Sequence, residues 1–180
     1  DNLASLRCAG IAGQIKTINT DYTMESCYTT EKASVSLVTK NTKANYIGGI
    51  IGLCNDGMKD CVNRAAVNVT ISEKNTTTEI TYIAGIAGRH VRTMDNCDNY
   101  GHIVADMAKS TNKLYSAPIV GHCFAATTVV SNCTNSGNLT ITNAGHTAKI
   151  GKIVGYGPAG YTVTGTTSTG IVTVNGKVLE

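Results

Sequence analysis

The chain has 180 residues, of which 42% are apolar and 15% are charged, a balance that favours one folded domain with a substantial core over a disordered segment. Its formal net charge of +3 falls short of the basic footprint of a nucleic-acid-binding protein, so we expect no nucleic-acid partner. No apolar run approaches the roughly 20 residues that span a bilayer, and we expect no membrane insertion. Because the sequence begins without a methionine or a signal peptide, it indicates a domain excised from a longer parent chain.

The first feature along the chain is a short Gly-aliphatic-x-Gly core, which recurs as an internal repeat. Every copy keeps the aliphatic residue at the second place, and the last two copies replace only the first glycine. The five copies lie at 10–13 (GIAG), 49–52 (GIIG), 85–88 (GIAG), 118–121 (PIVG) and 152–155 (KIVG). The repeats therefore extend over the whole chain.

Two further blocks follow each core at a nearly fixed distance. The first block ends at an equivalent position, occupied by Cys27, Cys61, Cys97, Cys133 and Thr166. The second block places apolar residues six and eight positions later, in the alternation that is typical of a strand. These pairs are Ala33 and Val35, Val67 and Val69, Ile103 and Ala105, Leu139 and Ile141, and Val172 and Val174.

Each copy thus predicts three short strands separated by turns, and no stretch has helical spacing. Asn63, Asn99 and Asn135 recur two residues after the cysteine, where we interpret them as turn formers. We expect the glycines to permit close approach at the corners of the coil and to supply positive φ angles where the coil turns.

A unit of three short strands cannot bury its apolar face alone, whereas stacked units can, because each strand pairs with its counterpart in the next coil. The sequence therefore predicts an all-β single domain that is a β-solenoid of about five stacked coils, with three short strands per coil and neighbouring coils ~4.8 Å apart. The expected coils are 7–45, 46–81, 82–114, 115–148 and 149–180.

The repeat resembles the GLUG-type repeats of bacterial secreted and surface proteins. The segments GGIIGLCNDGMKDCVNRAAV (48–67) and APIVGHCFAATTVVSNCTNSGNL (117–139) follow the pattern of that family along their length. The resemblance implies a stalk or adhesive module of a bacterial protein and brings no catalytic residues with it. The first and last copies, at CYTTEKASV (27–35) and TTSTGIV (166–172), lack the asparagine, as expected of terminal coils that cap a solenoid.

Seven cysteines raise the question of disulfides or metal binding. Cys27, Cys61, Cys97 and Cys133 occupy one ladder position, where parallel Cβ atoms lie slightly too far apart for a relaxed disulfide. We therefore expect buried free thiols, which pack as small hydrophobic side chains. No Cys-x-x-Cys or His-x-x-x-His spacing occurs, so we expect neither a metal nor a cofactor.

A column of tyrosines is the sharpest functional feature. Tyr46, Tyr82 and Tyr115 each lie three residues before the repeat core, and Arg7 and Lys149 hold the same position in the flanking coils. If the column faces outward, it forms an aromatic ledge for sugar rings or a partner strand, and if it faces inward, the rings fill a corner. In the adjoining core strand, the residues that point to each of the two faces are apolar, which predicts that both faces are buried. The outer face would then be covered by inter-coil loops or by another chain.

Two other function classes are tested against the same repeat. A β-helical polysaccharide lyase or hydrolase needs grouped carboxylates. The position of Asp60 is held by Ser26, Asn96 and Asn132 in other coils, so any small polar side chain suits it, which indicates turn hydrogen bonding rather than catalysis. His90 and His122 are interpreted as sharing one offset, without an adjacent nucleophile. An ice-binding solenoid requires a regular threonine ladder, which Val104 and Asp106 interrupt.

The sequence therefore predicts a non-enzymatic structural or adhesive repeat module of a secreted or surface-displayed bacterial protein. Its expected partners are a glycan, a host or partner surface protein, and neighbouring domains of its parent chain. The expected contacts are the tyrosine column with Arg7 and Lys149, and a lysine-bearing edge of inter-coil loops. The alternatives are an enzyme fragment acting on carbohydrate and, more remotely, an ice-binding solenoid.

Overall fold

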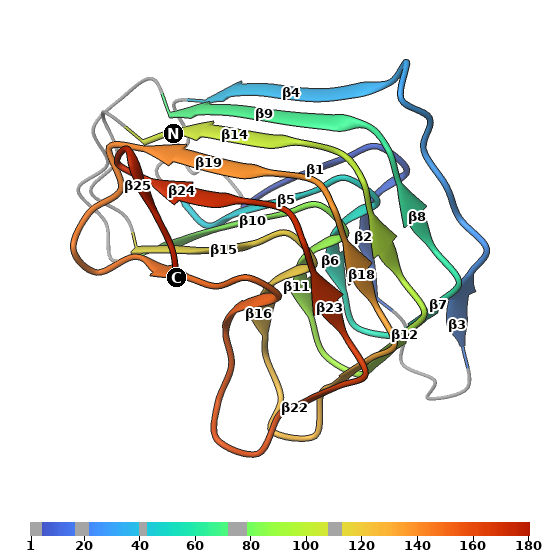
Figure 1. The fold of residues 1–180 in the computed structure, drawn as a ribbon. Coiled ribbons are helices and arrows are strands. Elements are labelled where there is room, and N and C mark those ends of the chain that lie inside the picture. The colour runs from blue at the N-terminus through green and yellow to red at the C-terminus, as the bar shows by residue number, and fades with distance from the viewer. Residues whose placement is uncertain (1–4, 17–21, 40–42, 72–78, 108–112) are drawn as a thin grey trace.

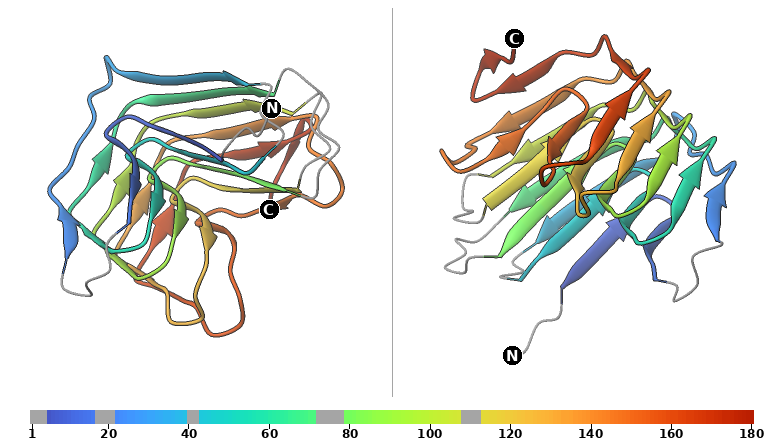
Figure 2. Two further views of the ribbon diagram at one scale, coloured as in Figure 1. Left: turned by 180° about the vertical axis from the view of Figure 1, so that it is seen from behind. Right: turned by 90° about the horizontal axis from the view of Figure 1, so that it is seen from below.

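The computed structural model describes residues 5–16, 22–39, 43–71, 79–107 and 113–180, and all regular secondary structure in these residues is β (Figure 1). The strands of successive coils pair in parallel and build five sheets, so the chain is a β-solenoid, as predicted. The coils follow one another from the N-terminal to the C-terminal end of the stack (Figure 2). The loop lysines Lys40, Lys74 and Lys109 lie outside the described residues.

Each sheet stacks the equivalent strands of successive coils. Sheet A contains β1 (Leu6–Ala9), β5 (Asn45–Gly48), β10 (Ile80–Ala84), β15 (Lys113–Ala117) and β20 (Lys149–Ile150). Sheet B contains β2 (Ala12–Ile15), β6 (Ile51–Cys54), β11 (Ala87–His90), β16 (Val120–Cys123) and β21 (Val154–Tyr156). Sheet C contains β3 (Thr23–Glu25), β7 (Gly57–Lys59), β12 (Thr93–Asp95), β17 (Val129–Ser131) and β22 (Thr162–Thr164).

The remaining two sheets complete the coil. Sheet D contains β8 (Val62–Asn63), β13 (Asp98–Asn99), β18 (Thr134–Asn135) and β23 (Thr167–Ser168). Sheet E contains β4 (Ser34–Thr39), β9 (Ala66–Ile71), β14 (Ile103–Asp106), β19 (Leu139–Thr142), β24 (Val172–Val174) and β25 (Lys177–Val178). The last of these, β25, folds back antiparallel on β24 and is the one antiparallel pair among the described strands. The described residues include no helix long and apolar enough to cross a membrane.

The coil has five strands rather than the three expected, because two of the predicted strands are each bent in the middle. The first bends between Gly48 and Ile51 and is divided between sheets A and B. The second bends at the residue before the cysteine, which has a positive φ in every coil, and is divided between sheets C and D. These φ angles are 55° at Ser26, 53° at Asp60, 50° at Asn96, 53° at Asn132 and 60° at Gly165.

The left-handed backbone at this bend explains why the position holds only small polar residues or glycine, because other side chains clash there. We expect Asn96→Val to destabilise the fold by about 1–2 kcal/mol more than Asn96→Gly, measured by urea unfolding. Both variants lose the hydrogen bond from Asn96 Nδ2 to Asp60 Oδ1 (2.6 Å), so their difference isolates the backbone cost. Equal losses in the two variants would contradict this explanation.

The expected role of the repeat-core glycines is half right. Positive φ angles among the described glycines occur only at Gly160, Gly165 and Gly176, and none of these belongs to a repeat core. The core glycines are required by close approach instead. A Cβ atom on Gly88 would lie 2.8 Å from the backbone nitrogen of Ile47, and one on Gly85 would overlap the side chain of Asn99.

The coil encloses two apolar cores. One lies between sheets A and E and includes Ile47, Ile83, Val67 and Ile103. The other lies between sheet B and sheets C and D and contains the cysteines of the ladder position. In cross-section the coil is bent, with sheets A and E forming one arm and sheets B, C and D the other (Figure 1). The bend creates a re-entrant corner on the outer surface, between sheets A and B.

All seven cysteines are free thiols, and of the four ladder cysteines predicted to be buried, Cys61, Cys97 and Cys133 are buried but Cys27 is not. Cys54, Cys61, Cys97, Cys123 and Cys133 are buried, whereas Cys8 and Cys27 in the first coil are half-exposed. The first coil differs from the predicted register in one respect. Val35, rather than Ala33, pairs with Val67, because two extra residues follow Cys27 in this coil. The apolar alternation is kept, since an insertion of two residues leaves each side chain on the same face.

The recurring asparagines, which the sequence predicted as turn formers, each donate to the backbone oxygen two residues later and also form a fully buried ladder through sheet D. Asn63 donates from Nδ2 to Asn99 Oδ1, and Asn99 donates in the same way to Asn135, both at 2.8 Å. The ladder ends at Thr29, which donates to Asn63 Oδ1 (2.6 Å), and at Ser168, which accepts from Asn135 (2.9 Å). Small hydroxyl side chains thus replace asparagine in the two terminal coils.

Candidate functional site

The tyrosine column predicted from the repeat is present in sheet A. The paired strands align Arg7 with Tyr46, Tyr46 with Tyr82, Tyr82 with Tyr115, and Tyr115 with Lys149. The Tyr46 and Tyr82 rings are stacked, with centroids 4.8 Å apart and planes at 12°. The Tyr82 and Tyr115 rings meet edge to face at 5.8 Å. All five residues of the predicted site are therefore brought into one register.

The column lies on the outer face of sheet A. The neighbouring residues Ile47 and Ile83 point into the core between sheets A and E, and successive side chains of a strand point to opposite faces. Tyr46, Tyr82 and Tyr115 belong to neither core. The rings nevertheless fill a corner, because sheet B turns back beside them. Both alternatives drawn from the sequence are thus partly right.

The second wall of the corner is a column of side chains in sheet B. Its members, paired in register, are Gln14, Leu53, Arg89, His122 and Tyr156. The His122 ring stacks on Tyr82 with centroids 5.3 Å apart and planes at 9°. Tyr156 lies 4.7 Å from Tyr115 and 5.6 Å from His122, between ring centroids. Sheet B of the same chain therefore covers this part of the outer face of sheet A. We name Tyr46, Tyr82, Tyr115, His122 and Tyr156 the aromatic corner.

Exposure differs along the aromatic corner. Tyr82 and His122, at its centre, are only 7% and 8% exposed, whereas Tyr46 and Tyr115 are half-buried and Tyr156 is 39% exposed. The centre therefore packs the two sheets together, and the flanking rings present the accessible surface. A ligand would meet Tyr46, Tyr115 and Tyr156 rather than Tyr82.

The corner combines aromatic rings with positive charge. The Arg7 guanidinium carbon lies 5.7 Å from the Tyr46 ring centroid, within the range of a cation–π interaction. Lys149 is exposed beside Tyr115 in the register of the sheet. Burial, followed by the nearby positive charge of Arg89, lowers the pKa of His122 to about 4, so its ring is neutral at physiological pH. Burial raises the pKa of Tyr82, so its phenol remains protonated.

Sequence reasoning missed His122, Arg89 and Tyr156 because it placed His122 one residue out of register. It aligned His122 with His90, but His90 pairs with Cys54 and Cys123, and His122 pairs with Arg89. A slip of one residue moves a side chain to the other face of a strand, so His90 points into the core and His122 into the corner. Counting one residue from the core glycine in every copy would have aligned the five members of this column.

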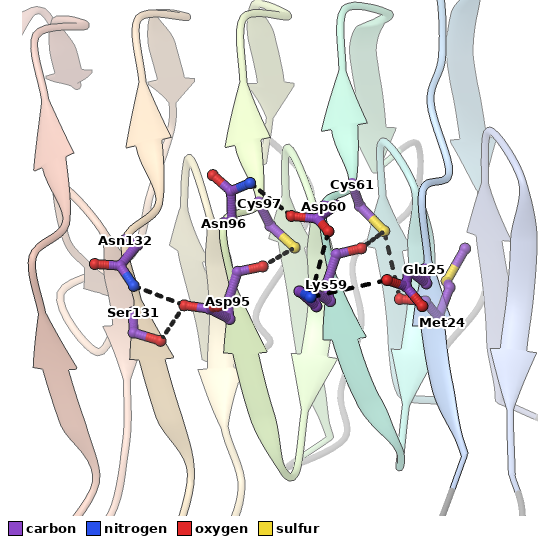
Figure 3. Close-up of polar contacts among 10 residues, drawn as sticks. All are labelled: Met24, Glu25, Lys59, Asp60, Cys61, Asp95, Asn96, Cys97, Ser131 and Asn132. Carbon is purple, nitrogen blue, oxygen red and sulfur yellow. Dashed lines mark hydrogen bonds and ion pairs between the residues drawn. The ribbon is translucent and has the colours of Figure 1, made fainter.

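The carboxylates beside the cysteine ladder lie along the bend between sheets C and D (Figure 3). Asp95 accepts hydrogen bonds at one oxygen from Ser131 Oγ (2.7 Å) and Asn132 Nδ2 (2.8 Å), which hold the pKa of its carboxyl below the usual value. Lys59 lies 3.9 Å from Glu25 and 3.7 Å from Asp60, between charged atoms. The contacts of Asp95 with Ser131 and Asn132, and that of Lys59 with Glu25, link neighbouring coils, whereas Lys59 and Asp60 are adjacent in one coil.

Within the described part of the chain, no three His, Cys, Asp or Glu side chains are placed to share a metal ion.

The fold and the site together define the protein as a parallel β-solenoid repeat with an aromatic, positively charged corner on its surface. Comparison with known proteins adds no relative, since no family model, curated protein or solved structure matches the chain.

Proposed function

We propose that the chain is a non-enzymatic adhesive repeat module that binds a glycan at the aromatic corner. The observation that carries the proposal is the column of Tyr46, Tyr82 and Tyr115 in sheet A, with Arg7 and Lys149 at its two ends and Tyr156 of sheet B beside Tyr115. Tyrosine rings offer an apolar face and a polar hydroxyl, which suits the mixed faces of sugar rings.

Contacts between coils support a structural role for the module. Two sets of repeated polar groups join the stacked coils: the buried asparagine ladder, and the contacts of Asp60 and Asp95 with the next coil. On the resemblance of the repeat to GLUG-type units, we propose further that the parent is a bacterial protein that is secreted or displayed on the cell surface. A host or partner surface protein is the second kind of ligand proposed for such an adhesive module.

The proposal is tested by screening the purified domain on a glycan array and then measuring the selected saccharide by calorimetry. The double variant Tyr46→Ala/Tyr115→Ala should bind it about 5- to 150-fold more weakly, because each lost ring contact removes about 0.5–1.5 kcal/mol. Tyr82 is left intact, since it packs sheets A and B together and its loss would destabilise the fold.

The matched control is Tyr28→Ala, which removes a tyrosine that is 72% exposed and lies outside the corner. Its affinity should equal that of the parent protein. Equal weakening in the control and in the double variant would show non-specific aromatic contact. Failure of the parent protein to bind any saccharide on the array would leave the module with a spacer role and would refute the proposal.

A further inference from the structure

A small pocket adjoins the aromatic corner, where β6, β11 and β16 end and the chain turns from sheet B towards sheet C. Its lining residues are Asn55, Arg89, Val91, Arg92, Phe124 and Thr127. Two arginines line it and no carboxylate does. We name it the arginine pocket.

Arg89 is held at this pocket by an aromatic ring rather than by an acid. Its guanidinium carbon lies 3.6 Å from the centroid of the Phe124 ring. Its Nε is buried without a hydrogen-bond partner, and no ion pair joins it to a carboxylate of the described residues. The charge of this guanidinium is thus not neutralised by a carboxylate of the described residues, and an anion in the pocket would supply that partner.

Arg92 is positioned from the other side of the pocket. Its Nε donates to the backbone oxygen of Asn55 at 3.1 Å, which fixes the side chain and leaves its terminal nitrogens as donors. The hydroxyl of Thr127 and the side-chain amide of Asn55 are further polar groups of the lining. Planar guanidinium groups match the geometry of carboxylate and sulfate oxygens, to which they bind through two parallel hydrogen bonds.

We infer that the arginine pocket binds the carboxylate or sulfate group of an acidic saccharide whose neighbouring sugar rings lie on the aromatic corner. The inference rests on the proposed function and specifies its ligand class. Continuity between the two surfaces supports it, because Arg89 pairs in register with His122, and the His122 and Phe124 ring centroids are 5.8 Å apart. One chain can therefore contact the rings of the corner and the charges of the pocket.

The test compares three oligosaccharides of matched length in calorimetry: a uronic-acid oligomer, its carboxyl-reduced neutral form, and a sulfated oligomer. The parent protein should bind one or both acidic oligomers about 10- to 100-fold more tightly than the neutral one. Arg89→Gln and Arg92→Gln should each remove most of this preference, and Arg92→Gln, a change outside the corner, should leave neutral binding unchanged. Arg89→Lys keeps the charge without the planar fork and should lose part of the preference, which separates recognition from folding.

Arg64→Gln is the matched control, because Arg64 also lies over an aromatic ring, 4.5 Å from the Tyr100 centroid, but does not line the pocket. Occupancy is read independently from the His122 ring by NMR. Arg89 lowers the pKa of His122, so an anion bound to Arg89 should raise it.

The outcomes separate the two proposals. Equal affinity for acidic and neutral oligomers, unchanged by Arg89→Gln, would overturn the arginine pocket and leave glycan binding intact. Absence of binding to all three oligomers, with a positive result for a glutamate-rich peptide that Arg89→Gln abolishes, would overturn the saccharide assignment and, with it, the proposed function. Preference for the uronic-acid or the sulfated oligomer identifies the anionic group.

Discussion

Asn99→Ala is expected to destabilise the domain by about 3–5 kcal/mol, because it interrupts the buried ladder at its centre and leaves several polar groups without partners. Asn99 Oδ1 accepts from Asn63, and its Nδ2 donates to Asn135 Oδ1 and to the Gly101 backbone oxygen (3.0 Å). Each buried group that loses its partner costs about 1–3 kcal/mol. Urea unfolding should therefore show a lower midpoint with an unchanged slope.

The position within the ladder provides a graded comparison. Ser168→Ala removes only the terminal acceptor, in a part-buried contact, and should cost less than Asn99→Ala. Asn68→Ala is the surface control, because Asn68 is exposed in β9, and it should change stability by about 0.5 kcal/mol or less. A loss of under about 1 kcal/mol for Asn99→Ala would show that the buried ladder contributes little to the stability of the fold.

Acid is expected to destabilise the domain through His90, whose ring is fully buried. Its column neighbours, Cys54 and Cys123, carry no charge that could stabilise an imidazolium. Burial lowers the pKa of His90 to about 4, and the backbone of Arg92 and Thr93 and the charge of Asp56 offset only part of this effect.

The direction of the pH dependence follows from this pKa. Because the folded state resists protonation while the unfolded state titrates near 6.5, stability is full above about pH 6.5 and falls as the pH drops towards 4. The loss attributed to His90 amounts to about 3 kcal/mol at the acid end of this window. Burial of His122, whose pKa is also lowered to about 4, adds to the same slope.

Unfolding free energies measured from pH 7 to pH 4 test this prediction. His90→Leu replaces the ring by an apolar side chain of similar size and should flatten the decline, whereas His146→Leu, at an exposed turn position, should leave it unchanged. An equally steep decline in His90→Leu would assign the acid sensitivity to other groups.

The repeat made the solenoid and the tyrosine register predictable. Aligning five copies places Tyr46, Tyr82 and Tyr115 in one column, because equivalent residues of stacked coils pair directly, and the structure has this pairing. The same alignment marked the cysteine and asparagine positions as repeated. It did not reveal that Asn63 and its equivalents are buried, since asparagine is common both in exposed turns and in buried ladders.

The aromatic corner could not be predicted from the repeat pattern, because it depends on the angle between the two halves of one predicted strand. The bend between Gly48 and Ile51 turns sheet B back beside sheet A, and neither residue has a positive φ that would mark a turn. Arg89 and His122 share the outward position in sheet B but differ in chemistry, so no repeated residue type identified their column. Side chains from two different coils then meet in the corner, as Tyr82 and His122 do.

Hydroxyl-radical footprinting of the individual tyrosines, with and without the saccharide selected on the array, tests the central claim that the aromatic corner is the binding surface. Binding at the corner should protect Tyr46, Tyr115 and Tyr156, leave the exposed Tyr28 as reactive as before, and find Tyr82 unreactive in both states. Protection of Tyr28 with unchanged reactivity at Tyr46 and Tyr115 would place the ligand elsewhere on the solenoid and contradict the claim.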